Sequence, residues 1–131
     1  MDKLKPKRKI THASAKAKGR ALQKLMAQKI STLIGLPCGK DEPIESRGGG
    51  QSGTDVRLDT AALKLFPFSV ECKWQESWSI PSWMKQAQAN RKEGTDWLLV
   101  CKRSNVNPIV VMDLETFLEM QDRLLKGNND G

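Results

Sequence analysis

The stretch FSVECKWQE, residues 68–76, decides how the rest of the sequence is interpreted. Side chains of a β-strand alternate between its two faces, so phenylalanine, valine and cysteine share one face here, while Ser69, Glu71 and Lys73 share the other. The first face is apolar and predicts a strand packed against a core. The second face places a carboxylate beside an ammonium group. Such a pair on a strand internal to a small domain is a candidate for a functional site.

The length of the chain limits its architecture. With 131 residues it is long enough for one domain and too short for two ordinary ones. No run approaches the roughly 18 consecutive apolar residues of a membrane span, and the basic N-terminus lacks the apolar core of a signal peptide. We therefore expect a soluble, cytoplasmic protein of a bacterial cell or a phage-infected host. Three widely spaced cysteines, Cys38, Cys72 and Cys101, indicate neither a disulfide framework nor a zinc site.

The positive charge lies at one end of the chain. Residues 1–20 contain eight basic residues and one acidic residue, which accounts for the whole formal excess of +7. A polyanion is the natural partner of such a block, and nucleic acid fits better than a membrane because no apolar face accompanies the charge. Lys16, Lys18 and Arg20 are therefore candidate DNA contacts, with a solvated tail as the alternative. We expect a flexible basic leader over residues 1–15, one domain over 16–126 and a disordered tail over 127–131.

Hydrophobic periodicity predicts an α/β protein. We expect helices over residues 15–34 and 81–93 and a third that begins after Asp113, and strands over residues 43–47, 54–58, 67–73, 96–102 and 107–112. The residues between the second and third strands form a connection with, at most, a helical turn. The order α-β-β-β-α-β-β-α predicts a central mixed sheet of about five strands flanked by helices, with the strand order left open.

One further carboxylate makes the charged pair a candidate site for a divalent cation. Asp55 begins the strand 54–58, sixteen residues before Glu71, and the two converge with Lys73 if their strands are neighbours. Carboxylates are suited to Mg²⁺ or Mn²⁺, and a lysine beside them can orient a water or offset charge on a phosphate. The backbone carbonyl of Cys72 is a possible further ligand. The alternative is a structural Glu71–Lys73 ion pair on a partly exposed strand.

The pattern SGTD-(15)-ECK, which contains Asp55, Glu71 and Lys73, resembles the signature of the PD-(D/E)XK nucleases. The blocks KGRALQ, RGGGQSGTDVRL, KLFPFSVECKWQE and QAQANRKEGTDWLLVCKR resemble, more narrowly, the small phage and prophage nucleases of that superfamily, described as Holliday-junction resolvases or endonucleases. The likeness covers about residues 16–118. It implies a restriction-endonuclease-like core.

The resemblance also implies roles for individual residues. Asp55 and Glu71 would bind the metal, Lys73 would be the catalytic lysine, and Gln75 would line the site from the same strand face. On the helix that follows, Gln86 or Gln88 would reach the DNA or the metal-bound water.

The first helix departs from the family pattern. Many members place a glutamate a few residues after a Lys-Gly element, and KGRALQ has Gln23 there. A neutral amide binds metal more weakly than a carboxylate, so one principal metal is expected. Gln23 would instead hydrogen-bond a water or the scissile phosphate.

Two further features are candidate DNA contacts. The glycine-rich run 48–53 allows the backbone to approach a phosphate, with Arg47, Gln51 and the Ser52 hydroxyl beside it, although a flexible turn explains the same composition. Trp74 lies near the proposed site, where stacking on a distorted base and packing are both open interpretations.

These observations lead to one expected function. We expect a Mg²⁺-dependent DNA endonuclease, and the resemblance implies a branched substrate, above all a four-way junction, and a role in DNA recombination. Two nearly symmetric cuts require a homodimer, joined through the final helix or the sheet edge. The alternatives are a nuclease that acts on linear or foreign duplex DNA, and a catalytically silent DNA-binding module.

Overall fold

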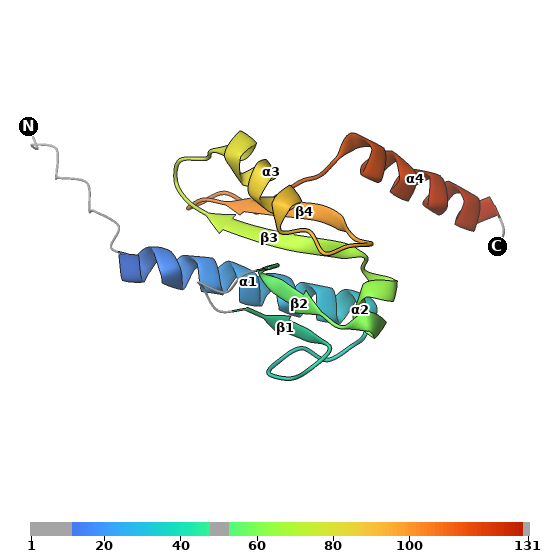
Figure 1. The fold of residues 1–131 in the computed structure, drawn as a ribbon, viewed down its shortest axis with the longest axis horizontal. Coiled ribbons are helices and arrows are strands. Elements are labelled where there is room, and N and C mark those ends of the chain that lie inside the picture. Colours follow the sequence, from blue (N-terminus) through green and yellow to red (C-terminus); the bar gives the residue numbers. More distant parts are fainter. Residues whose placement is uncertain (1–11, 48–52, 130–131) are drawn as a thin grey trace, which may run out of the picture.

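A computed structural model describes residues 12–47 and 53–129 and confirms the predicted fold class (Figure 1). The elements follow one another as α1 (His12–Ile34), β1 (Ile44–Ser46), β2 (Val56–Leu58), α2 (Thr60–Leu65), β3 (Phe68–Trp74), α3 (Ile80–Ala89), β4 (Asp96–Lys102), β5 (Ile109–Val111) and α4 (Leu114–Asn129). Five strands form one mixed sheet with helices around it. No helix within the described ranges is long and apolar enough to cross a membrane.

The strand order, which periodicity left open, is β1-β2-β3-β4-β5. β3 and β4 are parallel and paired over their full lengths, with α3 as the crossover between them. The other neighbours are antiparallel. β3 is therefore the central strand, and β1 and β5 are the edges.

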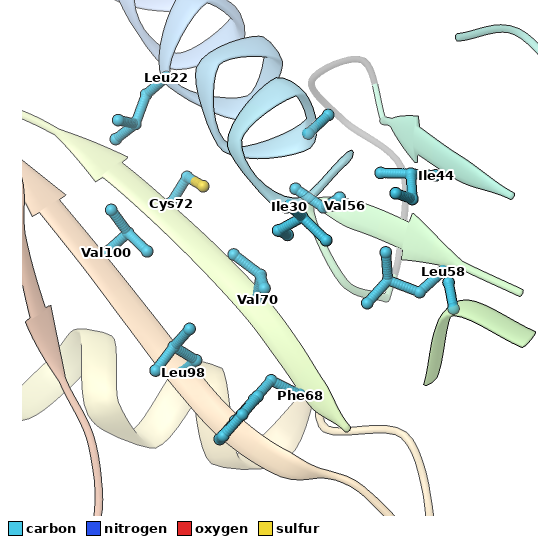
Figure 2. Close-up of a cluster of buried hydrophobic side chains, with 12 residues drawn as sticks. Leu22, Ile30, Ile44, Val56, Leu58, Phe68, Val70, Cys72, Leu98 and Val100 are labelled. Atoms are coloured by element: carbon cyan, nitrogen blue, oxygen red, sulfur yellow. The ribbon is translucent and has the colours of Figure 1, made fainter. Parts of the chain in front are cut away.

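Both faces of β3 are covered. Val70 and Cys72 pack toward α1, in a core that also contains Leu22, Ile30 and Val100 (Figure 2). The opposite face lies under α3, whose own apolar side chains form a second core with those of β4, namely Trp83, Ala87, Trp97, Leu99 and Cys101.

The covering of β3 excludes the partly exposed strand that was considered as an alternative. Ser69 and Glu71 are each only 4% exposed, so the charged face does not belong to a partly exposed strand. The carboxylate of Glu71 is placed in the interior, where an ionised group requires compensation.

Several element ends differ from those predicted. α1 begins at His12 instead of 15, and residues 127–129 belong to α4. α3 ends at Ala89 instead of 93, because the backbone N–H of Lys92 donates to Ser69 Oγ at 2.9 Å and holds the chain against β3. α2 is a complete short helix, since the Asp59 carboxylate caps it by accepting from the Ala62 N–H at 2.9 Å.

Candidate active site

The antiparallel β2–β3 pair brings Asp55 close to Glu71. Val56 of β2 pairs with Val70 of β3, and Asp55, which precedes Val56, lies beside the same part of β3. The backbone of Asp55 is held on both sides, because its N–H donates to Val70 O at 2.9 Å and its carbonyl accepts from Arg47 N–H at 2.8 Å.

The side chain of Asp55 is fixed as well. Its Oδ2 accepts a hydrogen bond from the Cys72 backbone N–H at 2.7 Å. A carboxylate thus takes the place that a backbone carbonyl of β2 would fill in a continued ladder. The bond directs the Asp55 carboxylate toward the strand that carries Glu71, and it satisfies a backbone donor at the point where β2 and β3 stop pairing.

A residue of α3 completes the surroundings of Glu71. The side-chain amide of Asn90 donates to Glu71 Oε2 at 3.4 Å. Asn90 follows the last residue of α3 and lies three residues after the buried Ala87, which itself follows the buried Trp83 by four residues. This spacing places Asn90 on the face of α3 that packs on the sheet.

The three signature residues influence one another electrostatically. Burial, and then the negative charge of Asp55, raises the pKa of Glu71 from its ordinary 4.5 to about 7, while Asn90 and Lys73 act in the opposite direction. Burial also raises the pKa of Asp55, against the lowering effects of the Cys72 N–H and the Lys73 ammonium. The fold thus brings Asp55, Glu71 and Lys73 together.

The structural ion pair considered as an alternative is not formed. Within 4.0 Å, the ion pairs in the described part of the chain are Arg57–Glu45, Arg123–Glu119 and Lys126–Asp122. Lys73 is half-buried and near two carboxylates, yet its ammonium is not committed to Glu71. This leaves the ammonium available to another negatively charged group.

The donor set fits one hard divalent cation. Asp55 and Glu71 are two shielded carboxylates whose raised pKa values show that the protein alone does not neutralise them fully, and a divalent cation between them would. Residues 12–47 and 53–129 contain no group of three or more His, Cys, Asp and Glu side chains that could hold a metal. The Cys72 thiol packs in the apolar core, and burial raises its pKa well above the ordinary value, so only its backbone carbonyl remains a predicted ligand.

Gln23 lies in the interior, as its place in the family pattern requires. It is 7% exposed, next to Leu22 on the face of α1 that meets the sheet, and its Oε1 has no hydrogen-bond partner among the described residues. A buried amide oxygen without a partner costs about 1–3 kcal/mol, which is consistent with an oxygen reserved for a water or ligand. Its approach to the substrate stays a prediction.

The other glutamines predicted near the site are exposed. Gln86 and Gln88 are exposed on α3, and Asn90 is the α3 side chain that contacts Glu71. Gln75 is exposed one residue beyond β3, and its backbone N–H donates to Lys102 O at 3.1 Å. Their contacts with water or DNA stay predictions. The sequence signal that was available for Asn90 is its helical spacing from Trp83 and Ala87.

Basic side chains gather at the end of β3. The ammonium groups of Lys102 and Lys18 lie 4.8 Å and 5.9 Å from the centre of the Trp74 ring, within the range of a cation–π contact. Lys18 is thus positioned by α1 beside the strand that carries the site, while Lys16 and Arg20 are exposed on the same helix.

A pocket of about 320 Å³ lies beside Asn90, the residue that contacts Glu71. Its lining includes Asn90 and Ser69 together with three cationic side chains, Arg47, Arg57 and Lys92. Arg57 is engaged by Glu45 at 3.1 Å. The predicted DNA contacts Gln51 and Ser52 lie outside the described residues.

Comparison with known proteins agrees with this geometry. The model of the family described as "Phage putative PDDEXK endonuclease" matches residues 14–127. The chain belongs to this family. Neither the curated proteins nor the solved structures that were searched gave a match. The family match confirms the resemblance seen in the sequence, and the residues of the D…E-x-K signature are the ones that β2 and β3 bring together.

Proposed function

We propose that the protein is a metal-dependent endonuclease that hydrolyses phosphodiester bonds in DNA. The observation that carries the proposal is the position of the Asp55 carboxylate, which the Cys72 N–H holds close to the buried Glu71. The carboxylate pair, with Lys73 beside it, has the composition of a site for a divalent cation and a phosphate. The family description supports the same class of reaction.

Asp55 and Glu71 are the residues that would hold Mg²⁺, or Mn²⁺ in its place. Such an ion, when bound, supplies Lewis-acid polarisation of a phosphate oxygen and lowers the pKa of a bound water. For this task Glu71 must be ionised, and its pKa of about 7 without metal makes binding compete with a proton. The Asn90 amide favours the ionised carboxylate and fixes its orientation.

Lys73 is the residue expected to act on the substrate. Its ammonium is not held by Glu71 in an ion pair, so it can orient the attacking water or stabilise negative charge that develops on the scissile phosphate. Gln23 and Gln75 have supporting roles in this proposal. The unsatisfied Oε1 of Gln23 would accept a hydrogen bond from a water in the site.

Two sets of cations are the proposed contacts for DNA. Lys18 and Lys102 lie at the Trp74 ring at the end of β3, and Arg47 and Lys92 line the pocket beside Asn90. Backbone phosphates bind such cations without regard to sequence. Lys16, Arg20 and Gln86 would extend the contact. A four-way junction is the proposed substrate, a homodimer the proposed assembly, and the cytoplasm of a bacterium or infected host the proposed location.

The test is cleavage of matched labelled DNAs by wild-type protein and site variants. We expect Mg²⁺-dependent cleavage, lost by about 100-fold or more in Asp55→Asn, Glu71→Gln and Lys73→Ala, because each removes a group that acts on the transition state. Glu76→Gln is the matched control, since this exposed carboxylate near the end of β3 bonds Ser104, away from the site residues, and should leave the rate within about twofold.

The outcomes separate the candidate functions. Cleavage that persists in all three variants, or that does not require a divalent cation, contradicts the site. Binding of DNA without cleavage by the wild type identifies a silent binding module. Four-way junctions, flaps, nicked and linear duplexes of one sequence are compared in parallel, and faster cleavage of linear duplex would exclude the junction preference while leaving the nuclease proposal intact.

A further inference from the structure

Exposed apolar side chains are concentrated on the C-terminal elements. Among the described residues, nine large apolar side chains are exposed, and seven of them lie on β5 and α4. Those seven are Ile109, Val110, Leu114, Phe117, Leu118, Leu124 and Leu125, which are 40% to 66% exposed. Single exposed apolar residues are ordinary, but a cluster on consecutive elements indicates a surface that is covered in use.

The orientation of α4 explains this exposure. The helix packs on the rest of the protein through Thr116, which is 9% exposed, and Met120, which contacts the main core. At 3.6 residues per turn, Leu114, Phe117, Leu118 and Leu125 fall on a different side of the helix. Figure 1 shows α4 beside the end of the sheet, set apart from the layers formed by α1 and α3. The apolar stripe of α4 therefore faces solvent in the single chain.

We propose that the α4 stripe and β5 form the interface between two copies of this chain, with the two α4 helices packed antiparallel about a two-fold axis. A stable interface buries about 800 Å² on each partner and has an apolar centre with a polar rim. The sixteen residues of α4 extend for about 24 Å, and the short edge strand β5 carries two further exposed apolar residues, Ile109 and Val110. The inference rests on packing alone and does not depend on nuclease activity.

The charges of α4 favour a second copy and specify its direction. Glu115 and Glu119 lie in the N-terminal half, whereas the C-terminal half carries Arg123 and Lys126 against the single carboxylate of Asp122. Glu115, Asp122 and Lys126 border the same edge of the apolar stripe by helical spacing. A two-fold axis across the middle of the stripe brings that edge against itself in reverse, so Glu115 of one helix approaches Lys126 of the other. Parallel packing about a two-fold axis would instead set this edge against the opposite edge of the stripe, where Glu115 and Lys126 do not meet.

The mass of the protein in solution, measured by sedimentation equilibrium, tests the interface. We expect two chains for the wild type and one for Leu118→Glu, with association weakened by about 100-fold or more, because a charge enters the apolar centre twice in a symmetric dimer. Leu33→Glu is the matched control, since this leucine is 71% exposed on α1 away from the stripe, and it should stay dimeric. Circular dichroism checks that each variant keeps its helices.

Each other result overturns the proposal. A wild-type monomer at every concentration, or a dimer that survives Leu118→Glu, removes α4 as the interface. Dissociation by Leu33→Glu as well would assign the contact to the apolar groove of about 440 Å³ that Leu33, Leu65 and Leu124 line, and not to the stripe.

A charge exchange tests the antiparallel direction. Glu115→Lys should weaken association by up to about fivefold for each symmetric contact, and adding Lys126→Glu should restore it. The two residues lie about 16 Å apart along one helix, so they cannot compensate within a chain, and the small loss of the Asp122–Lys126 pair affects both directions alike. Failure of the double variant to recover would contradict antiparallel packing.

Discussion

Glu71 is the residue where burial and charge conflict most strongly. It is 4% exposed, lies close to Asp55, and accepts a side-chain hydrogen bond from Asn90. With a pKa of about 7, the carboxyl is protonated in about half of the metal-free molecules at neutral pH. A residue selected for stability alone would not be an acid in this position, since its ionisation is unfavourable without a compensating cation.

The stability of the metal-free protein should therefore depend on pH through Glu71. Its pKa is raised from 4.5 to about 7 on folding, so the unfolded chain loses the proton first as pH rises. The free energy of unfolding should fall across this window, on the order of 3 kcal/mol in total, and level off above it. Urea unfolding in the presence of EDTA measures the effect.

Glu71→Gln provides the control for this pH dependence. The amide does not ionise, so the variant should lose the fall in stability between pH 4.5 and about 7. The raised pKa of Asp55 contributes a remainder of the same sign. Equal slopes in wild type and variant would show that Glu71 keeps an ordinary pKa.

Asn90 should tune the activity through the same carboxylate. Asn90→Ala removes the amide that favours the ionised form of Glu71, so the acid limb of the pH–rate profile should move to higher pH. The rate near neutral pH should fall by about tenfold, since a hydrogen bond to a charged group contributes about 1.5–3 kcal/mol. At higher pH much of the rate should return. Ser82→Ala, an exposed change on the same helix, should leave the profile in place.

At the residue scale, the site residues that belong to a signature with fixed spacing were predictable from the sequence. Contacts between side chains of different elements were not. Asp55, Glu71 and Lys73 follow from strand periodicity together with a signature. Asn90 was missed because its role depends on which face of α3 packs on the sheet, and exposed Gln86 was preferred for its chemistry. The lack of an ion pair between Glu71 and Lys73 also depends on side-chain geometry that no spacing encodes.

At the element scale, one hydrogen-bond network holds α3 and β4 in place on β3. Ser69 Oγ lies 2.6 Å from Thr95 Oγ1, Thr95 Oγ1 donates to Lys92 O at 2.6 Å, and the Lys92 N–H donates to Ser69 Oγ. The network closes the loop that brings the chain from α3 into β4. Because Asn90 lies just before this loop, the network also supports the contact with Glu71.

Ser69→Ala should destabilise the protein by about 1–3 kcal/mol, because the Lys92 N–H loses its acceptor and the buried Thr95 hydroxyl loses a partner. Denaturant unfolding measures the loss. Ser104→Ala is a suitable comparison, since the hydrogen bonds of Ser104 go to the exposed Glu76 carboxylate and lie outside this network, and it should stay within about 0.5 kcal/mol. Equal stability of the two variants would show that this network does not stabilise the fold.

The types of the elements were predictable, and their ends and order were not. Period-two and helical patterns are properties of a few consecutive residues, so all five strands and three of the helices were expected. The end of α3 is set by the contact between Lys92 and Ser69, and the order of the strands by packing across the whole sheet. Neither is a local property.

At the scale of the whole molecule, the site lies where the sheet opens. β4 pairs with every residue of β3, whereas β2 pairs with β3 only at Val56 and Val70 before Asp55 replaces the ladder with its side chain. Among the described residues, 12–47 and 53–129, no strand covers the edge of β3 beyond this point on the β2 side. An opened edge next to two carboxylates gives a phosphate a way to approach, while α1 and α3 keep both faces of the strand covered.

The basic N-terminal residues should act on DNA affinity and not on the fold. α1 begins at His12, so the informative deletion removes residues 1–11, with five basic residues and one acidic residue, and keeps Lys16, Lys18 and Arg20 on the helix. Each cation that neutralises a phosphate adds about 0.9 to the slope of log affinity against log salt. The deletion should weaken binding and flatten this slope by up to about 4.5, as measured by fluorescence anisotropy in a salt series.

The same deletion separates binding from chemistry. The site residues lie on β3 and just before β2, and the described core begins at Leu22 of α1, so the unfolding midpoint and the single-turnover rate at saturating DNA should not change. A slope that stays the same would show that residues 1–11 do not contact phosphates. A lower rate at saturation would instead show that the N-terminal residues position the substrate, because affinity no longer limits the reaction under that condition.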